Sequence, residues 1–203
     1  HGEMPERLSI LPLRNLLLFP GVVTSVLVGR DGSKKLIEQA SHKGGLIVLA
    51  LQKDAEIEDP QSDDMHHIGV VAAIQRVQRL PDNQMQVLVR GIAKVALSEF
   101  VREDSFWSVR VQPLAEADTQ GRQVEALGQN LSQLFQKMVS LSPNLTEELK
   151  ITALNLDRKP AELGDFVAAG LDIAAEDKQR LLEETSLRHR LEQLTVLLNQ
   201  EVE

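Results

Sequence analysis

The sequence predicts an α+β fold, with a β-rich N-terminal subdomain over residues 1–115 followed by an α-helical bundle over residues 116–203. Before Pro113 the apolar residues alternate with polar ones or form short β-branched runs, which is the pattern of strands. After Pro113 they recur every three or four residues, which is the pattern of amphipathic helices. Aromatic residues make up only 3% of the chain, so we expect both cores to consist mainly of Leu, Val, Ile and Ala.

Six strands and one helix are predicted in the β-rich subdomain. The strands are the short segments rich in Val, Ile and Leu, at residues 8–11, 22–28, 46–51, 70–80, 85–100 and 107–111. Pro81–Gln84 has the composition of a tight turn and joins two of them as a hairpin. Gly91 interrupts the second arm and indicates a bulge or bend. The helix runs from about Asp31 to Ser41, with Leu36, Ile37 and Ala40 on its inner face.

Five helices are predicted in the second half. The longest carries one apolar stripe, formed by Val124, Leu127, Leu131, Leu134, Met138 and Leu141. Ser142-Pro143 ends it, and Asn144 with Glu147 resembles a capped start for the next helix, whose inner residues are Leu145, Leu149, Ala153 and Leu156. Asp157 is expected to cap a short helix over Pro160–Ala169, closed by Gly170. The last two cover about 174–184 and 186–202, and the final one reaches the end without a stop signal, so we expect it to continue beyond residue 203.

Composition narrows the class of protein. The formal net charge of -8 argues against nucleic acid as a main partner, because phosphate binding needs a basic face. The chain has no Cys, which removes disulfides, thiolate metal ligands and a Cys nucleophile. No apolar run is long enough to span a bilayer, and no signal-peptide pattern opens the chain. We therefore expect a cytoplasmic protein with no membrane partner.

The common catalytic motifs are missing. There is no phosphate-binding glycine loop, no Gly-Lys pair and no G-x-S-x-G elbow. We therefore expect no catalytic residue, no cofactor and no metal site in these residues. Three features leave alternatives open. His66-His67 after Asp63-Asp64 forms either a metal cluster or a solvated loop. The acidic stretch Asp54–Asp64 binds a cation or a basic partner, or is a polar loop. Leu16–Pro20 is either core or an exposed binding patch.

The order of short motifs resembles the N-terminal domain of the Lon ATP-dependent protease family. The resemblance covers residues 8–203, and its motifs are Leu11–Asn15, Phe19-Pro20-Gly21, Val28-Gly29-Arg30, Gln52-Lys53, Pro60, Asp63-Asp64-Met65, Ile68-Gly69-Val70, Leu80-Pro81-Asp82, Val87–Gly91, Leu163-Gly164-Asp165, Lys178–Leu182 and Arg190-Leu191-Glu192. The chain departs from the family pattern at three places. Asn83 replaces a hairpin Gly but tolerates positive φ, Gly164 replaces a common Ala, and Ser25-Val26 lacks a proline.

The resemblance implies a PUA-like β subdomain, a helical bundle and a terminal helix that leads towards an ATPase ring. It also implies that this region recognises unfolded, damaged or tagged protein substrates and supports hexamer assembly, while the ATPase and Ser–Lys protease modules lie downstream. The candidate substrate-binding residues are large and apolar, and they are Leu16, Leu17, Phe19, Pro20, Met65 and Trp107. Two alternatives are a stand-alone adaptor of the same fold that binds one partner, and a metal-dependent hydrolase that uses His66 and His67.

Overall fold

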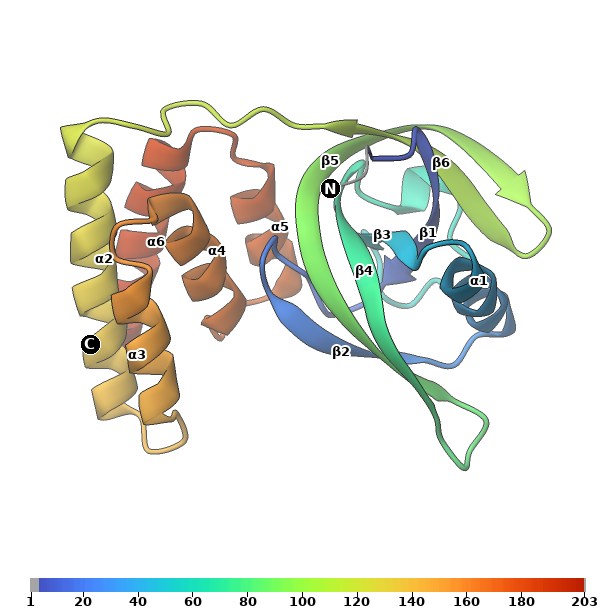
Figure 1. Cartoon of the computed structure of the whole chain (residues 1–203), viewed down its shortest axis with the longest axis horizontal. Helices are drawn as coiled ribbons and strands as arrows, with labels where there is room; N and C mark the ends of the chain where they lie inside the picture. The colour runs from blue at the N-terminus through green and yellow to red at the C-terminus, as the bar shows by residue number, and fades with distance from the viewer. Residues whose placement is uncertain (1–3, 203) are drawn as a thin grey trace. The chain divides into compact units, whose positions relative to one another are not determined.

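The computed structural model of the protein describes residues 4–202, and the chain divides into two compact units between Leu114 and Ala115. The first unit holds all the strands and one helix (Figure 1). Its elements are β1 (Arg7–Leu13), β2 (Val23–Val28), α1 (Asp31–His42), β3 (Leu46–Leu51), the short 3-10 turn η1 (Ser62–Asp64), β4 (Ile68–Arg79), β5 (Met85–Glu103) and β6 (Phe106–Pro113). The predicted α+β class is confirmed, and the predicted helix and hairpin are found in place.

The six strands form one mixed sheet that curls into a barrel. The order is β2-β5-β4-β3-β1-β6, and β5 pairs with β6 as well as with β4, so the sheet returns on itself. Among the pairs of the six described strands, β1 and β3 alone run parallel. Inward-facing aliphatic side chains fill the barrel, among them Ile10, Val48, Ala50, Met65, Val71, Val95, Leu97, Val109 and Val111. The core is therefore aliphatic, as the composition predicts.

The long hairpin of β4 and β5 bends at the predicted bulge. The register slips between Val71 and Ala72, where Ile92 is left over on β5 next to Gly91. Gly91 also pairs with the turn after Phe19, because its carbonyl accepts from Gly21 N at 2.9 Å and its own N donates to Val22 O at 2.9 Å. A side chain at position 91 would collide with the Phe19 carbonyl, so only Gly allows this close approach. The hairpin turn places Asn83 at φ 65°, as expected for an Asn in place of Gly.

Several sequence-based boundaries in the first unit need correction. β1 continues through Pro12 to Leu13. Leu13 O accepts from Gln52 N, so the backbone of Leu13 faces β3 and that of Pro12 faces the other edge of the strand. Proline is tolerated there because no hydrogen bond to β3 needs its N–H. β5 runs to Glu103 rather than Phe100, since β6 pairs with its far end as well. Lys94 alternates with the apolar Ala93, Val95 and Leu97, a pattern that predicts an outward, polar face for it, but it is buried.

The described part of the second unit is built from five helices. They are α2 (Arg122–Leu141), α3 (Glu147–Asn155), α4 (Pro160–Gly170), α5 (Ala175–Glu183) and α6 (Leu187–Val202). α2 packs on α3, α4 and α6. The buried face of α6 is the predicted one, formed by Leu187, Leu191, Leu194 and Leu198. Among the described residues no helix is long and apolar enough to cross a membrane.

The predicted stripe on α2 is displaced. Val124, Leu131 and Met138 are buried, but Leu127 and Leu134 are half-buried and Leu141 is 63% exposed. Phe135 and Val139 take their places, because the helices that pack on α2 cover a wider arc than one stripe. Phe135 meets Phe166 edge-to-face with ring centroids 5.4 Å apart.

The predicted helix caps are wrong. The N-cap of α3 is Thr146 rather than Asn144, and that of α4 is Lys159 rather than Asp157. Neither makes a side-chain capping bond, and Pro160 at the first position of α4 needs no N–H partner. Of the four residues expected on the inner face of α3, only Ala153 is fully buried.

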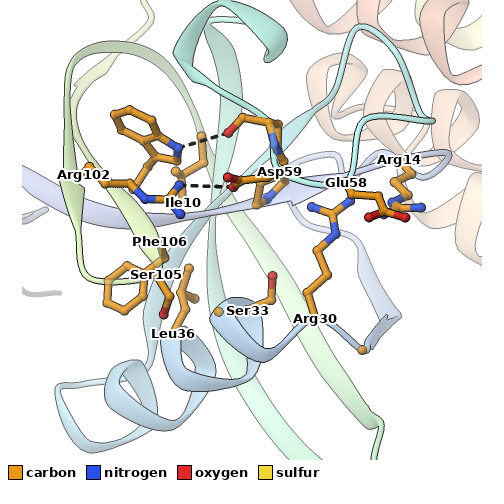
Figure 2. A pocket seen from close by; sticks show the side chains of 15 residues that line it. Ile10, Arg14, Arg30, Ser33, Leu36, Glu58, Asp59, Arg102, Ser105 and Phe106 are labelled. Carbon is orange, nitrogen blue, oxygen red and sulfur yellow. Dashed lines mark hydrogen bonds and ion pairs between the residues drawn. The ribbon is translucent and has the colours of Figure 1, made fainter.

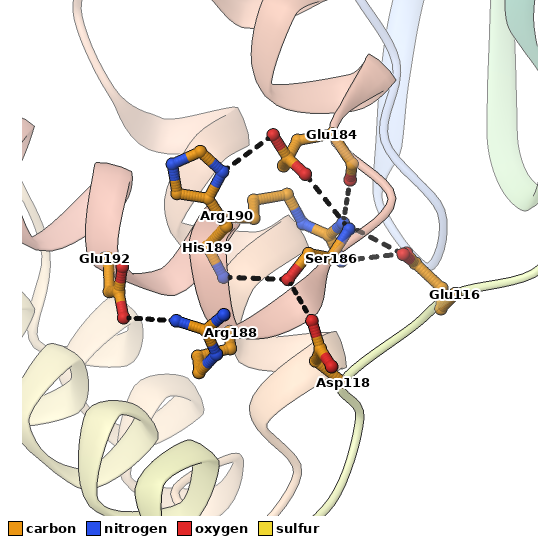
Figure 3. Close-up of polar contacts among 8 residues, drawn as sticks. All are labelled: Glu116, Asp118, Glu184, Ser186, Arg188, His189, Arg190 and Glu192. Carbon is orange, nitrogen blue, oxygen red and sulfur yellow. Dashed lines mark hydrogen bonds and ion pairs between the residues drawn. The ribbon is translucent and has the colours of Figure 1, made fainter.

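A buried ion pair fixes the start of α6 to the segment before α2 (Figure 3). Arg190 is 1% exposed, and its two terminal nitrogens donate to both carboxylate oxygens of Glu116 at 3.1 and 2.8 Å. Arg190 Nη1 also donates to the carbonyl of Glu184 at 2.6 Å. Next to this pair, Ser186 Oγ donates to Asp118 Oδ2 at 2.7 Å and accepts from His189 N at 3.2 Å. These bonds position the N-terminal end of α6 against residues 116–118.

Candidate functional site

Two adjoining grooves open on the surface of the first unit. The β1–α1 groove, of about 470 Å³, lies among β1, the start of α1, residues 58–60 and β6. The β1–β2 groove, of about 680 Å³, lies between residues 11–16 and residues 25–30. Both volumes fall in the range of about 300–1,000 Å³ that is usual for ligand pockets. The side chains of Arg14 and Arg30 line both grooves, so the two hollows meet at a pair of guanidinium groups.

The β1–β2 groove is bordered by an unpaired strand edge. β2 pairs with β5 alone. Because Val22 O accepts from Gly91 N, the backbone groups of residues 24, 26 and 28 face β5, and those of 23, 25 and 27 face the opposite edge. Within residues 4–202 no second strand pairs with that edge. It therefore presents backbone donors and acceptors to any extended chain that reaches it.

Large apolar side chains are exposed along the same edge. Leu27 is 59% exposed and Leu16 is 37% exposed, and both line the β1–β2 groove. Val23, two positions before Ser25 on the same face of β2, is 48% exposed. The groove thus combines apolar surface with backbone groups that no described strand pairs.

A buried glutamine positions Arg30 at the end of the groove. Gln52 is 2% exposed, and its Oε1 accepts from Arg30 Nη2 at 2.8 Å. Its Nε2 donates to the carbonyls of Asp54 and Ile57 at 3.1 and 3.0 Å. One buried amide therefore fixes both the guanidinium and the beginning of the acidic segment 54–64.

The two guanidinium groups repel each other. Burial lowers the pKa of Arg30, and the neighbouring Arg14 lowers it further, while Asp59 and Glu58 act in the opposite direction. Figure 2 shows Arg14, Arg30 and Glu58 close together at one end of the β1–α1 groove. Arginine stays protonated in proteins, so two guanidinium charges line both grooves here, with the carboxylates of Glu58 and Asp59 on the β1–α1 side.

The single tryptophan holds the acidic segment from the other side. Trp107 Nε1 donates to the carbonyl of Pro60 at 3.1 Å. Arg102 lies over its ring, with Cζ 5.4 Å from the centroid, and reaches Asp59 Oδ1 at 3.4 Å. Both bonds are drawn in Figure 2. The acidic stretch is therefore a surface loop tied to the barrel at Gln52 and at Trp107.

Three of the six predicted binding residues are not on the surface. Phe19 and Met65 are fully buried and Leu17 is 9% exposed, so the expectation of a patch that includes them is wrong. Met65 belongs to the barrel core, where its segment bridges to Gln52. Phe19 is buried where its turn lies against Gly91. The apolar run 16–19 is thus mostly core.

The other three predicted residues keep some exposure. Leu16 lines the β1–β2 groove, Trp107 lines the β1–α1 groove, and Pro20 is half-buried in the turn that precedes β2. A substrate contact by any of them stays a prediction.

Sequence reasoning missed Leu27, Arg14 and Arg30. The signal for Leu27 was available, because Val23, Ser25 and Leu27 occupy alternate positions of a predicted strand and must share one face. The two arginines gave no such signal, since the grooves form only when β1 and the start of α1 meet.

The histidine pair has neighbours on the barrel. His67 Nε2 lies 2.9 Å from the Ser62 carbonyl oxygen, and its ring lies 5.1 Å from that of Phe100. Within the described part of the chain, no group of three or more His, Cys, Asp or Glu side chains is placed to hold a metal ion.

Comparison with known proteins connects this architecture to one family. The family model of the ATP-dependent protease La (LON) substrate-binding domain matches residues 7–200. The chain belongs to this family. The sequence resemblance to Lon is thereby confirmed.

Lon proteases from several bacteria match almost the whole chain. The protein from Dictyoglomus thermophilum is 36% identical over 99% of the chain, and that from Desulforamulus reducens is 36% identical over 98%. The chain spans about a quarter of the length of these relatives, 25% and 24% respectively. The matched quarter corresponds to the substrate-binding domain that the family model describes.

Two solved structures share the fold. The N-terminal domain of the Mycobacterium avium complex Lon protease aligns over 95% of this chain and 98% of its own, with a TM-score of 0.80 and 20% identity. The Lon N-terminal domain protein from Xanthomonas campestris aligns over 94% and 97%, with a TM-score of 0.64 and 18% identity.

Proposed function

We propose that this domain recognises unfolded or damaged polypeptides on behalf of a Lon protease, and that it does so through the β1–β2 groove. The observation that carries the proposal is the coincidence of exposed Leu16 and Leu27 with the unpaired edge of β2. Non-native chains offer exposed apolar side chains and free backbone groups, which native proteins bury. A groove of this composition suits weak contacts that tolerate many sequences.

The test is a titration with one protein in two states. The domain is added to a labelled polypeptide that is permanently unfolded by reduction and alkylation, and to the same polypeptide in its native, disulfide-bonded form. We expect binding to the unfolded form only. Equal affinity for both forms would contradict the proposal.

Variants locate the binding surface. Leu16→Ser with Leu27→Ser should weaken binding of the unfolded polypeptide about tenfold, because each removes exposed apolar area. Val196→Ser is the matched control, since Val196 is 57% exposed but lies on α6. If Val196→Ser binds the unfolded polypeptide as weakly as the double variant does, the groove is not the binding surface.

We also propose that the domain supports assembly of a hexameric Lon protein. The helical unit carries several exposed aliphatic side chains that its own fold does not cover, namely Leu141, Ile151, Leu154 and Val196. In a full-length protein, Ile151→Ser with Leu154→Ser should lower the hexamer fraction measured by analytical ultracentrifugation. Leu27→Ser should leave the hexamer fraction unchanged. An unchanged hexamer fraction in the Ile151→Ser, Leu154→Ser variant would show that this face of the helical unit has no part in assembly.

A further inference from the structure

The β1–β2 groove is a gap between two strand edges that lack partners. On one side, β6 pairs with β1 over Arg7–Ile10, and within residues 4–202 no strand pairs with the following residues of β1 on that edge. On the other side lies the free edge of β2, with the backbone groups of Val23, Ser25 and Leu27 directed away from β5. Residues from both edges line the groove. An extended chain placed here would meet backbone donors and acceptors at every second residue of β2.

The two edges are not equivalent. On β1 the exposed edge position is Pro12, which has no N–H to offer. On β2 all three edge residues keep both groups. An added strand would therefore form its regular hydrogen-bond ladder with β2, at the usual strand spacing of about 4.8 Å.

Charge at the end of the groove distinguishes the two directions of an added strand. β2 runs from Val23 towards Arg30, where the guanidinium groups of Arg14 and Arg30 line the groove. A strand parallel to β2 would bring its carboxyl terminus to these two positive charges. An antiparallel strand would bring its positively charged amino terminus there, which is unfavourable. Gln52 holds Arg30 from behind, so the guanidinium is already in position.

We propose that the groove binds the free C-terminal segment of a non-native polypeptide as an added strand parallel to β2, with its terminal carboxylate between Arg14 and Arg30. This inference rests on the proposed recognition of non-native chains and specifies which part of the substrate is bound and how. Exposed Leu16 and Leu27 provide apolar contacts for alternate side chains of the bound segment. The carboxylate accepts charge-assisted hydrogen bonds from the two guanidinium groups.

The first experiment uses the unmodified domain and short peptides. An N-terminally fluorescein-labelled hexapeptide of alternating Val and Thr is titrated by fluorescence anisotropy, with a C-terminal carboxylate or a C-terminal amide. We expect the amide to bind about tenfold more weakly. In the Arg14→Gln, Arg30→Gln variant the two peptides should bind alike. Equal binding to the wild-type domain would overturn the carboxylate site.

The second experiment tests the ladder. Single N-methyl groups are placed in turn along the peptide, and loss of affinity should occur at every second position, where the N–H faces β2. A loss that is uniform, or absent, along the peptide would overturn strand addition while leaving recognition of non-native chains intact. Failure of the domain to bind either the peptides or an unfolded polypeptide would overturn both.

A backbone variant provides an independent check. Ser25→Pro removes an N–H that no strand within residues 4–202 uses, and proline is tolerated on an edge strand. It should abolish peptide binding, whereas Ser25→Ala, which keeps the N–H, should bind as the wild type does. Circular dichroism verifies that both variants are folded. If Ser25→Pro does not fold, the N-methyl series, which needs no variant, decides the question.

Discussion

Loss of Glu116 should destabilise the helical unit more than loss of the charge on Arg190. Glu116→Ala leaves the guanidinium of Arg190, 1% exposed, with the Glu184 carbonyl as its remaining hydrogen-bonded acceptor. Arg190→Met keeps the apolar stem in place and leaves the carboxylate of Glu116, which is 27% exposed and can be hydrated. The two halves of one ion pair thus differ in how much water can replace the lost partner.

The magnitudes follow from this difference in burial. An uncompensated buried charge costs about 3–5 kcal/mol, so we expect Glu116→Ala to lower the free energy of unfolding by about 3–4 kcal/mol. Arg190→Met should cost about 1–2 kcal/mol, the price of charge-assisted hydrogen bonds to a partly hydrated carboxylate. The double variant should be more stable than Glu116→Ala alone, because the buried charge is then gone.

Urea unfolding followed by far-ultraviolet circular dichroism measures these values. The helical signal reports mainly on the second unit, because α2 to α6 lie there and only α1, among the described α-helices, lies in the first unit. Fluorescence of Trp107, the single Trp, follows the first unit and serves as an internal control. A cost below about 1 kcal/mol for Glu116→Ala, or strictly additive single and double variants, would refute the reasoning.

Three further outcomes can be checked on purified variants. Gly164→Ala should raise the free energy of unfolding by about 0.5–1 kcal/mol, because Ala has the higher helix propensity. The added methyl group would lie at ordinary van der Waals distances of 3.5 and 3.7 Å from Leu191 and Leu194. A drop in stability would contradict this. Gly91→Ala should lower the free energy of unfolding of the barrel by more than about 2 kcal/mol, on the order expected for overpacking against backbone. A thermal unfolding midpoint close to that of the wild type would disprove the close approach. Trp107→Phe should cost about 1 kcal/mol through the lost bond to Pro60 and speed amide exchange in residues 54–64, and unchanged exchange there would show that the loop is held elsewhere.

The fold was largely predictable because its signals are local. A short, continuous apolar run placed β3 at its observed bounds, and the three-four spacing placed α6 with its buried face. The same locality explains the errors. Lys94 is buried although its neighbours suggested a polar face, and the caps of α3 and α4 depend on how the helices meet rather than on side-chain type.

The candidate site was less predictable because it depends on contacts between distant residues. In the site, Arg30 and Gln52 are joined across 22 positions. In the helical unit, Arg190 and Glu116 are joined across 74. Several residues in the motifs that carry the Lon resemblance make such long-range hydrogen bonds, including Gln52, Pro60 and Arg190. Phe19 and Met65 were candidates for a surface patch, but the close approach at Gly91 and the barrel interior bury them.

Amide hydrogen exchange of β2, resolved by nuclear magnetic resonance, tests the central claim most directly. The free domain and the domain saturated with an unfolded polypeptide are compared residue by residue. The account predicts that exchange at Val23, Ser25 and Leu27 is slowed on binding, while residues 24, 26 and 28, already bonded to β5, change little. Protection confined to the helical unit, or none within residues 11–30, would contradict recognition through the β1–β2 groove.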